Sequence, residues 1–451
     1  MQKITEKLAH FVCGTDVLPA EVEAAAKVAL IDTLGCALAG FPEPAAALAR
    51  EHVADIGARP VATVWGSSAR TAPAEAAFAN AVATHVLDFD DTLATLRGHA
   101  SAPALAVALA VAEQVGAPGK AVLTAYAIGI EIAGKLGRVF GDGHYLKGWH
   151  NTATVGIFAA TAVAAKLRGD DESTLRNAWG VAAAECGGVL RNFGTMSKSF
   201  QTGHAARAAI IAEDLARRGF TANDAMFDGD HSFQQLYGSN VDDAPAIVVR
   251  LGAPWDLLEP GMNYKRWPCC YCSHRGLGGL IDLMAEHRIR PEEIEGIRIG
   301  FPPGADEPLV YDDPRTGLEG KFSAQYPVAA LMLDGKLNLQ SFTDSMVQRP
   351  AVRAWLAKIE RYRVPDGKVY SGTVGYTDIT VKTARGDFSR RVDRGPGSRL
   401  WPVSEGDHRD KFLSCAQIVM TPAQAAGVLH SLTTFETLAD VGPLLEATAP
   451  R

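Results

Sequence analysis

The densest group of side chains that could do chemistry lies in the segment HVLDFDDTLATLRGHASAP, residues 85–103. Alanine-rich apolar runs at 73–83 and 104–112 flank this segment and predict buried helices. A buried segment tolerates this many polar groups only when they are paired or line a cavity. The Asp residues could instead cap helices or form an Asx turn. For the whole group a functional site is the better explanation, and we expect it to contain Asp88, Thr92 and His99.

Other polar breaks between apolar helices supply further candidates. They are Tyr145 and His150, then Lys198, then Lys265 with Arg266, and Tyr326. Cationic side chains in loops between domains suit a substrate that carries carboxylates, which Arg can grip in bidentate fashion. A His can move a proton near neutral pH, and either His99 or His150 could do so. Asp88 would hold a His tautomer or bind a substrate hydroxyl.

The sequence lacks the motifs of several other mechanisms. It contains no GxGxxG after a predicted strand, no GxxxxGK[ST], no GxSxG and no HExxH. The CCYCSH segment at 269–274 lacks the spacers and the distant second ligand pair of a structural zinc site. We therefore expect neither a metal nor a cofactor. A carboxylate-binding protein without catalysis is the alternative of another class, but two His and several Lys are more than binding requires.

Helical patterns dominate the first half of the chain. They are predicted over 19–38, 44–56, 73–87, 101–116, 120–140, 152–167, 172–186 and 203–218, with a small hairpin arm beginning at 61–65. Ser101 should cap its helix and Gly116 should end it. Residues 141–150 are expected to form a loop. Gly129 and Gly134 inside one helix indicate close contacts with neighbouring helices.

The pattern changes after residue 257. Alternation of period two predicts strands at 294–301, 376–382 and 387–393, among helices at 276–287, 324–333 and 352–359. The closing stretch, including 422–432, is again helical. We predict a mainly α protein in which residues 1–266 and 396–451 form an all-helical domain. Residues 267–395 would form a smaller α+β domain.

Composition limits the class of protein. The 451 residues are 47% hydrophobic and 21% charged, as in a globular chain of more than one domain. A net charge of −7 argues against a nucleic-acid partner. The longest apolar runs are too short for a membrane span, and no secretory signal opens the chain. Seven Cys are an odd number, which favours reduced thiols. A cytoplasmic location is expected.

Six segments resemble the MmgE/PrpD superfamily, which includes 2-methylcitrate dehydratase, cis-aconitate decarboxylase and iminodisuccinate epimerase. They are IDTLGCALAG (31–40), LDFDDT (87–92) with the later His99, GWHNTATVG (148–156), SKSFQTGHAAR (197–207), YKRWPCCYCSH (264–274) and EGKFSAQYPVAALMLDG (319–335). They occur in family order over nearly the whole chain. The resemblance implies an α+β lid inserted in the helical domain, a homodimer, and a site between the domains that needs no metal or cofactor.

The resemblance places seven residues of this chain in the site, namely Asp88, Thr92, His99, His150, Lys198, Lys265 and Tyr326. Together with Tyr145 and Arg266 from the polar breaks, we expect His99, His150, Asp88, Lys198 and Tyr145 to act in catalysis, and Thr92, Lys265, Arg266 and Tyr326 to bind the substrate. Cys270 stands where the decarboxylases have a second His after the matching Lys. We expect an enzyme that abstracts a proton next to a carboxylate of a small di- or tricarboxylate. A lyase of the dehydratase or decarboxylase type is favoured, and an epimerase is the alternative.

Overall fold

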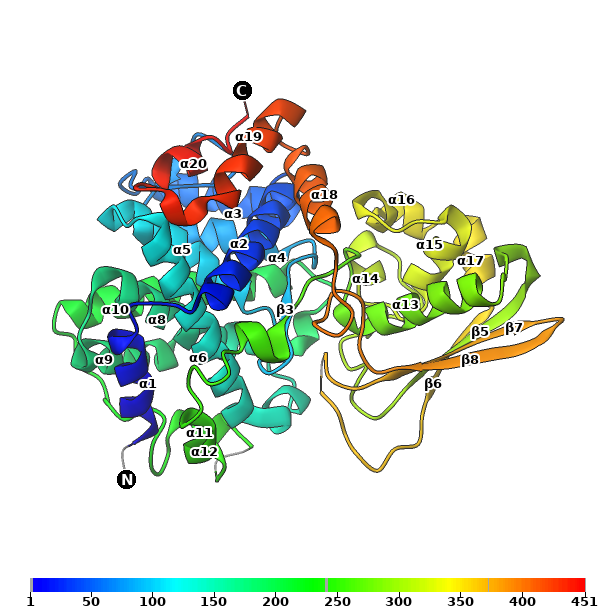
Figure 1. Cartoon of the computed structure of the whole chain (residues 1–451), viewed down its shortest axis with the longest axis horizontal. Coiled ribbons are helices and arrows are strands. Elements are labelled where there is room, and N and C mark those ends of the chain that lie inside the picture. Colours follow the sequence, from blue (N-terminus) through cyan, green and yellow to red (C-terminus); the bar gives the residue numbers. More distant parts are fainter. Residues whose placement is uncertain (1–2, 240–241, 372, 451) are drawn as a thin grey trace.

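The chain forms a large helical body and a smaller part that contains a four-stranded sheet (Figure 1). The computed structural model describes residues 3–239, 242–371 and 373–450. The helices of the body are α1 (Ile4–Gly14), α2 (Ala20–Gly40), α3 (Pro44–Ile56), α4 (Pro73–His85), α5 (Ser101–Val115), α6 (Gly119–Leu146), α7 (Asn151–Thr154), α8 (Gly156–Arg168), α9 (Glu172–Ala184), α10 (Ser197–Arg217), α11 (Phe233–Tyr237), α12 (Ala244–Val248), α18 (Glu405–Ala416), α19 (Pro422–Thr433) and α20 (Gly442–Glu446).

The smaller part is built from both kinds of element. Its helices are α13 (Tyr271–Glu286), α14 (Gly317–Gly320), α15 (Tyr326–Asp334), α16 (Asp344–Val347) and α17 (Pro350–Leu356). Its strands are β5 (Ile294–Phe301), β6 (Ile359–Arg363), β7 (Thr377–Thr383) and β8 (Gly386–Val392). Two short ribbons belong to the body, formed by β1 (Ala62–Thr63) with β2 (Arg70–Thr71) and by β3 (Thr92–Leu93) with β4 (Met262–Asn263). The protein is therefore mainly α, as predicted.

Small residues let the body's helices pack closely. A Cβ on Gly129 would lie 2.4 Å from Cγ2 of Val163, and one on Gly134 would lie 2.3 Å from Cγ of Asp256. Both distances are far below van der Waals contact, so α6 can take no larger residue there without a shift of its neighbours. The close contacts predicted from these glycines are confirmed.

Two local predictions for the body are wrong. Residues 141–150 are not all loop, because α6 continues to Leu146 through a kink at Gly141, where φ is 66°. Ser101 does not cap α5; its hydroxyl donates to Asp91 Oδ2 at 2.6 Å and pairs with Tyr126 Oη at 2.6 Å. Gly116 does end α5 in the left-handed conformation.

The sheet has the strand order β6-β5-β7-β8. β5 pairs in parallel with β6 and antiparallel with β7, and β7 pairs antiparallel with β8. Its strands all come from residues 294–392, so the sheet does not include any strand of the body. The pattern over 352–359 misled the prediction: α17 ends at Leu356 and Ile359 begins β6.

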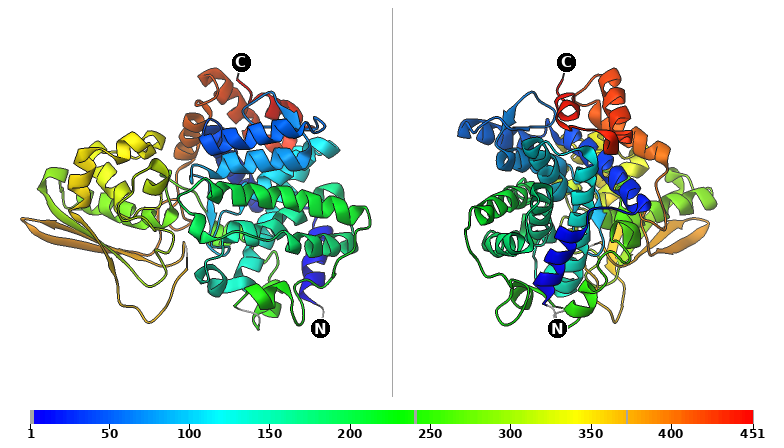
Figure 2. Two further views of the ribbon diagram at one scale, coloured as in Figure 1. Left: turned by 180° about the vertical axis from the view of Figure 1, so that it is seen from behind. Right: turned by 60° about the vertical axis from the view of Figure 1, so that its left-hand side comes forward.

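The two ends of the chain lie on the helical body. α18 packs against α2 although they are far apart in sequence, and Figures 1 and 2 show the last helices beside α2 and α3. The apolar core of the body accordingly joins residues 4–262 with 412–445, whereas the second core draws on residues 267–381 and Phe193. In the part of the chain described, no single helix has the length and apolar character needed to span a bilayer. α2 and α3 meet that test only as a pair bent by 86°.

Candidate active site

The DFDDT segment begins where α4 ends. His85 is the last residue of α4, and the backbone of Asp88 then takes a left-handed conformation with φ of 51°. β3 follows and pairs with β4, with Thr92 opposite Asn263. The turn points three carboxylates into the interior, where Asp88 is 2% exposed and Asp90 and Asp91 are fully buried. Buried carboxylates need partners, and each of the three has a different set.

Asp88 binds two lysines. Its Oδ1 accepts from Lys198 Nζ at 2.6 Å, and its Oδ2 accepts from Lys265 Nζ at 2.7 Å. Lys265 also donates to the Asp88 carbonyl at 2.8 Å. Burial alone would raise the pKa of Asp88, but the two ammonium groups hold it well below its usual range. With two cations and one anion, the group has a formal charge of +1, which favours anions nearby.

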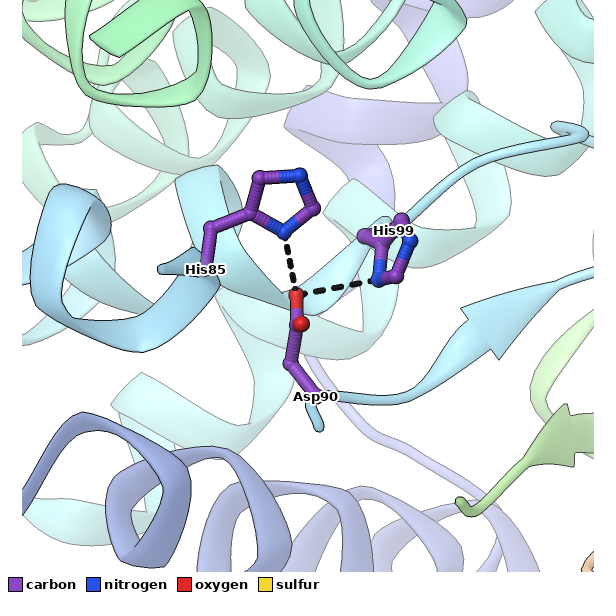
Figure 3. A group of neighbouring side chains, drawn as sticks. All are labelled: His85, Asp90 and His99. Carbon is purple, nitrogen blue, oxygen red and sulfur yellow. Dashed lines mark hydrogen bonds and ion pairs between the residues drawn. The ribbon is translucent and has the colours of Figure 1, made fainter. Parts of the chain in front are cut away.

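Asp90 contacts two imidazoles, as Figure 3 shows. Its Oδ2 lies 2.8 Å from Nδ1 of His85 and 3.1 Å from Nδ1 of His99. The other nitrogen of His85 accepts from Lys198 Nζ at 2.8 Å. His99 Nε2 lies 3.6 Å from Asp88 Oδ1, beyond hydrogen-bond distance. Burial lowers the pKa of His99 to about 3, so the imidazole is neutral at neutral pH.

His150 stands at the start of α7 and leaves one nitrogen free among the described residues. Its Nδ1 lies 2.8 Å from Oε1 of Gln201, while its buried Nε2 has no hydrogen-bond partner there. Burial, with Lys198 nearby, lowers the pKa of His150 well below its usual value. His85 stacks on His150 at 5.7 Å and meets His99 edge-on at 4.4 Å between ring centroids. Three neutral imidazoles thus pack together.

A small cavity joins these groups to the sheet-containing part. The body supplies Asp88, Thr92, Arg97, Gly98, His99, Tyr145, His150, Thr152, Phe193 and Lys198, and the smaller part supplies Cys270, Tyr271, Cys272, Pro308, Phe322 and Thr373. The predicted residues Asp88, Thr92, His99, Tyr145, His150 and Lys198 therefore come together. Between them they offer neutral bases, an ammonium group and a phenol, a set suited to acid/base chemistry on an anion.

Three predicted residues lie elsewhere. Lys265 is fully buried behind Asp88 and does not line the cavity. Arg266 is exposed, with its guanidinium 5.5 Å from the Trp267 ring centroid. Tyr326 packs in the second core and donates its hydroxyl to the Ser341 carbonyl. None of these three residues lines the cavity, and the polar groups of Lys265 and Tyr326 bond to Asp88 and to the Ser341 carbonyl instead.

Sequence reasoning missed several residues of the site. His85 and Asp90 lay in the predicted segment but were not chosen, since the pattern alone does not rank one Asp of DFDD above another. Gln201 follows Lys198 by one helical turn on α10, and that i, i+3 spacing was a usable signal. Asp88 was predicted to hold a His tautomer, but Asp90 Oδ2 lies closer to the imidazoles of His85 and His99 than Asp88 Oδ1 lies to His99.

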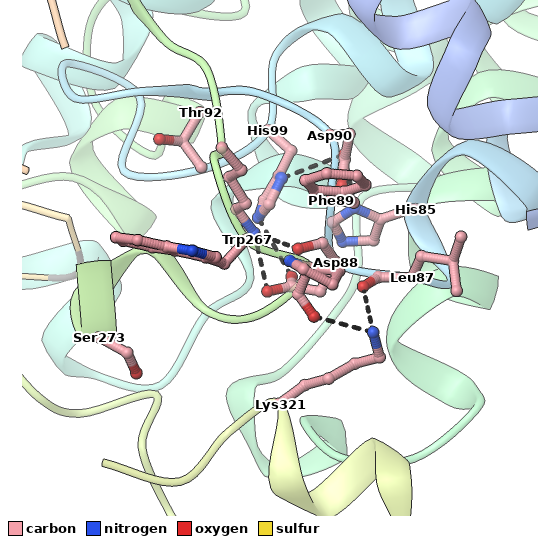
Figure 4. A network of polar contacts seen from close by, with 12 residues as sticks. His85, Leu87, Asp88, Phe89, Asp90, Thr92, His99, Trp267, Ser273 and Lys321 are labelled. Atoms are coloured by element: carbon pink, nitrogen blue, oxygen red, sulfur yellow. Dashed lines mark hydrogen bonds and ion pairs between the residues drawn. The ribbon is translucent and has the colours of Figure 1, made fainter. Parts of the chain in front are cut away.

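Lys321 was also missed, and Figure 4 shows it below the Asp88 turn. Its Nζ donates to the carbonyls of Leu87 at 2.7 Å and Pro268 at 2.9 Å. Burial lowers its pKa to about 8. Because Leu87 precedes the left-handed Asp88 and Pro268 begins the smaller part, Lys321 connects the turn to the smaller part.

Among the described residues, His85, Asp90 and His99 form the group that could hold a metal ion, with ligand atoms within 4.8 Å of one another. Their contacts resemble a hydrogen-bonded network more than an open metal site, since Asp90 Oδ2 approaches both nitrogens and Lys198 donates to His85. The Lys ammonium groups nearby oppose a cation. No disulfide joins the Cys residues in the part of the chain that the structure describes.

Comparison with known proteins identifies the family of the chain. The MmgE/PrpD N-terminal domain matches residues 6–245, and the MmgE/PrpD C-terminal domain matches residues 267–432. The chain is 28% identical to cis-aconitate decarboxylase of Homo sapiens over 98% of this chain and 94% of that protein. It is 26% identical to the enzyme of that name from Mus musculus, over 98% and 93%. For the protein of that name from Aspergillus terreus the identity is 21%, over 98% and 95%. With both domain families matched along most of its length, this chain belongs to the MmgE/PrpD family.

Proposed function

We propose that this protein is a cofactor-independent lyase that acts on a small di- or tricarboxylate through a carbanion next to a carboxylate. Decarboxylation of a cis-aconitate-like substrate is the first candidate reaction. The observation that carries the proposal is the convergence of His99, His150 and Lys198 on one cavity. The full-length similarity to proteins named cis-aconitate decarboxylase supports the choice of reaction.

The charge of the site suits such a carbanion. Loss of CO₂ from an allylic carboxylate leaves its electron pair conjugated with a remaining carboxylate, as an enediolate. Preorganised cations stabilise charge that develops in this way. Lys198 lines the cavity, and Lys265 pairs with Asp88 from behind, so Asp88 divides its charge between two ammonium groups and the Lys198 ammonium can also face the substrate.

His99 and His150 are the proposed proton carriers. A carboxylate close to an imidazole favours its charged form, so a bound polycarboxylate raises the pKa of His99 from its low resting value. The imidazolium then delivers a proton to the α-carbon of the enediolate. Thr92 and Tyr145 line the cavity and would orient the substrate through their hydroxyl groups. Arg266 and Tyr326 have no proposed contact with it.

A second candidate is epimerisation, because two neutral His line the same cavity. One would remove the α-proton and the other would return a proton on the opposite face. Dehydration needs the same proton abstraction and a leaving hydroxyl. A carboxylate-binding protein without catalysis is the alternative of another class.

Turnover in deuterated water distinguishes these alternatives. The purified protein would be incubated with cis-aconitate, 2-methylcitrate and iminodisuccinate, and the products followed by NMR. Decarboxylation of cis-aconitate with one deuterium incorporated next to a carboxylate supports the first candidate. His99→Gln is the matched control for contaminating activity. Binding of all three compounds without product or deuterium exchange would overturn the enzyme proposal.

Further parts of the proposal concern assembly and motion. We propose a homodimer, and a smaller part (residues 267–395) that closes on the body as a lid. Lys321 could couple the smaller part to the body, since its ammonium group donates hydrogen bonds to the carbonyls of Leu87 in the body and Pro268 near the start of the smaller part. Light scattering would measure the mass in solution, and X-ray scattering with and without substrate would detect closure.

A further inference from the structure

Asp90 is a buried carboxylate without a cationic side chain as its direct partner among the described residues. Its side chain is fully buried, and Oδ1 has no hydrogen-bond partner there. The two lysines of the site bind Asp88 instead. The contacts of Oδ2 are the imidazoles of His85 and His99. Burying an ionised carboxylate beside neutral groups is costly, so a purely structural role leaves the position unexplained.

We propose that Asp90 is a positioning residue that holds both His85 and His99 with the proton on Nδ1. This rests on the proposed role of His99 as proton carrier. With the proton on Nδ1, the His85 ring donates to Asp90 Oδ2 at 2.8 Å, and the His99 ring holds its N–H 3.1 Å from the same oxygen, near it but outside hydrogen-bond geometry. The basic lone pair of each ring is then on Nε2.

The atoms near Nε2 differ between His85 and His99, so the two rings would have different roles. His85 Nε2 already accepts from the Lys198 ammonium at 2.8 Å, so it has no free lone pair. Among the residues that the structure describes, none makes so short a hydrogen bond to His99 Nε2, and Asp88 Oδ1 lies 3.6 Å from it. Unlike His85, His99 also lines the cavity. His99 is therefore the ring that can exchange a proton with substrate, and His85 supports Lys198.

The same geometry indicates that Asp90 stabilises the His99 ring most when that ring is protonated. When His99 Nε2 takes a proton, its Nδ1–H remains and the ring becomes an imidazolium 3.1 Å from the Asp90 carboxylate. An ion pair then replaces an ion–neutral contact. The buried charge of Asp90, poorly compensated in the resting enzyme, stabilises the imidazolium. Its effect should therefore fall on the catalytic step, with little effect on substrate binding.

Two alternative geometries are less favourable. If His99 carried its proton on Nε2, the Nδ1 lone pair would face Asp90 Oδ2 at 3.1 Å and the two would repel. If a metal ion joined the three residues, it would stand between Asp90 and both rings and displace these contacts.

The test uses nitrogen NMR of the full-length protein labelled with ¹⁵N at its His residues, with signals assigned through His85→Gln and His99→Gln. Both rings of the wild type should show a protonated Nδ1 and an unprotonated Nε2 at pH 7. Asp90→Asn should disturb both signals, because an amide can turn its NH₂ toward the rings and favour the other tautomer. Asp90→Ala removes the acceptor altogether.

Asp91→Asn is the matched control. Asp91 is equally buried and adjacent, but its Oδ2 accepts from Ser101, and burial together with Asp32 raises its pKa well above the usual range. This variant should leave both His signals in place. Asp90→Asn should lower kcat by about 10²–10⁴-fold with little change in KM, as expected for loss of an acid/base group.

Several results would overturn the proposal. Finding that wild-type His99 is protonated on Nε2 alone would overturn it, even if no Asp90 variant folds. Identical His signals in the wild type and in Asp90→Asn would also overturn it. So would a stoichiometric metal ion that is present in the wild type and lost in Asp90→Asn. If the wild type converts no polycarboxylate but its His signals respond to Asp90→Asn, the proposed function fails and the positioning of the rings by Asp90 stands.

Discussion

Lys198 Nζ lies 2.6 Å from Asp88 Oδ1, although 110 residues separate them in the chain. The first residue comes from the start of α10 and the second from the turn after α4, two helices that pack along each other. Because both side chains are nearly fully buried, removing Asp88 would leave the Lys198 ammonium without its carboxylate partner in a medium of low polarity, whereas removing Lys198 leaves Asp88 paired with Lys265 alone. This pair therefore connects the stability of the body to the charge of the site.

Replacing Lys265 by Met should destabilise the fold more than it weakens substrate contact. Its ammonium is fully buried on Asp88, and breaking a buried pair typically costs about 3–5 kcal/mol of unfolding free energy.

Lys198→Met removes the ammonium that lines the cavity and should in addition raise KM. Urea unfolding and steady-state kinetics on both variants check this. Equal KM values for Lys198→Met and wild type would remove Lys198 from the substrate site.

His99→Gln should lower kcat by about 10²–10⁴-fold while changing KM little. The imidazole lines the cavity as a neutral group, so it can carry a proton but contributes little charge for binding. The variant should also lose one limb of the pH–rate profile. Wild-type kcat and pH dependence in His99→Gln would make this residue structural and leave His150 as the leading candidate.

Stability should fall as the pH is lowered from 7 to 5. Burial lowers the pKa of His85, His99 and His150 in the folded protein, whereas unfolded His titrates near pH ~6.5. Below that pH the unfolded chain binds more protons than the folded chain, so the free energy of unfolding decreases with decreasing pH. Urea unfolding at pH 7, 6 and 5 measures the slope. His99→Gln should reduce it, and an unchanged slope would contradict a neutral buried His99.

Tyr326→Phe should leave kcat and KM near wild-type values. The Tyr326 hydroxyl donates to the Ser341 carbonyl inside the second core and does not reach the cavity. Loss of that hydrogen bond should cost about 1 kcal/mol of stability, seen as a lower melting temperature. A large rise in KM would instead support the direct substrate contact expected from family resemblance.

Activity should not depend on a bound metal ion. The three side chains able to form a metal site contact one another through Asp90, and ammonium groups stand close by. Elemental analysis of the purified protein and assays after EDTA treatment provide the measurement. Stoichiometric zinc or iron, with activity lost on chelation and restored by the ion, would refute this prediction.

The sequence by itself determined the helical class, the period-two strands and the segments that carry the chemistry. β5 at Ile294–Phe301 and α3 at Pro44–Ile56 have the predicted bounds, because a period-two pattern and a proline start are local signals. The family also followed from the sequence, since its motifs are short and lie in order. The domain limits at 266 and 396 and the roles of the site residues stay predictions.

Only the tertiary structure decided which charged groups share a site. Three Asp in DFDD look alike in the sequence, yet Asp88 binds lysines, Asp90 contacts histidines and Asp91 contacts Ser101. Likewise, Lys198 lines the cavity while Lys265 is hidden behind Asp88. The physical reason is that partners of a buried charge come from distant elements, so their choice depends on how helices pack and not on local spacing.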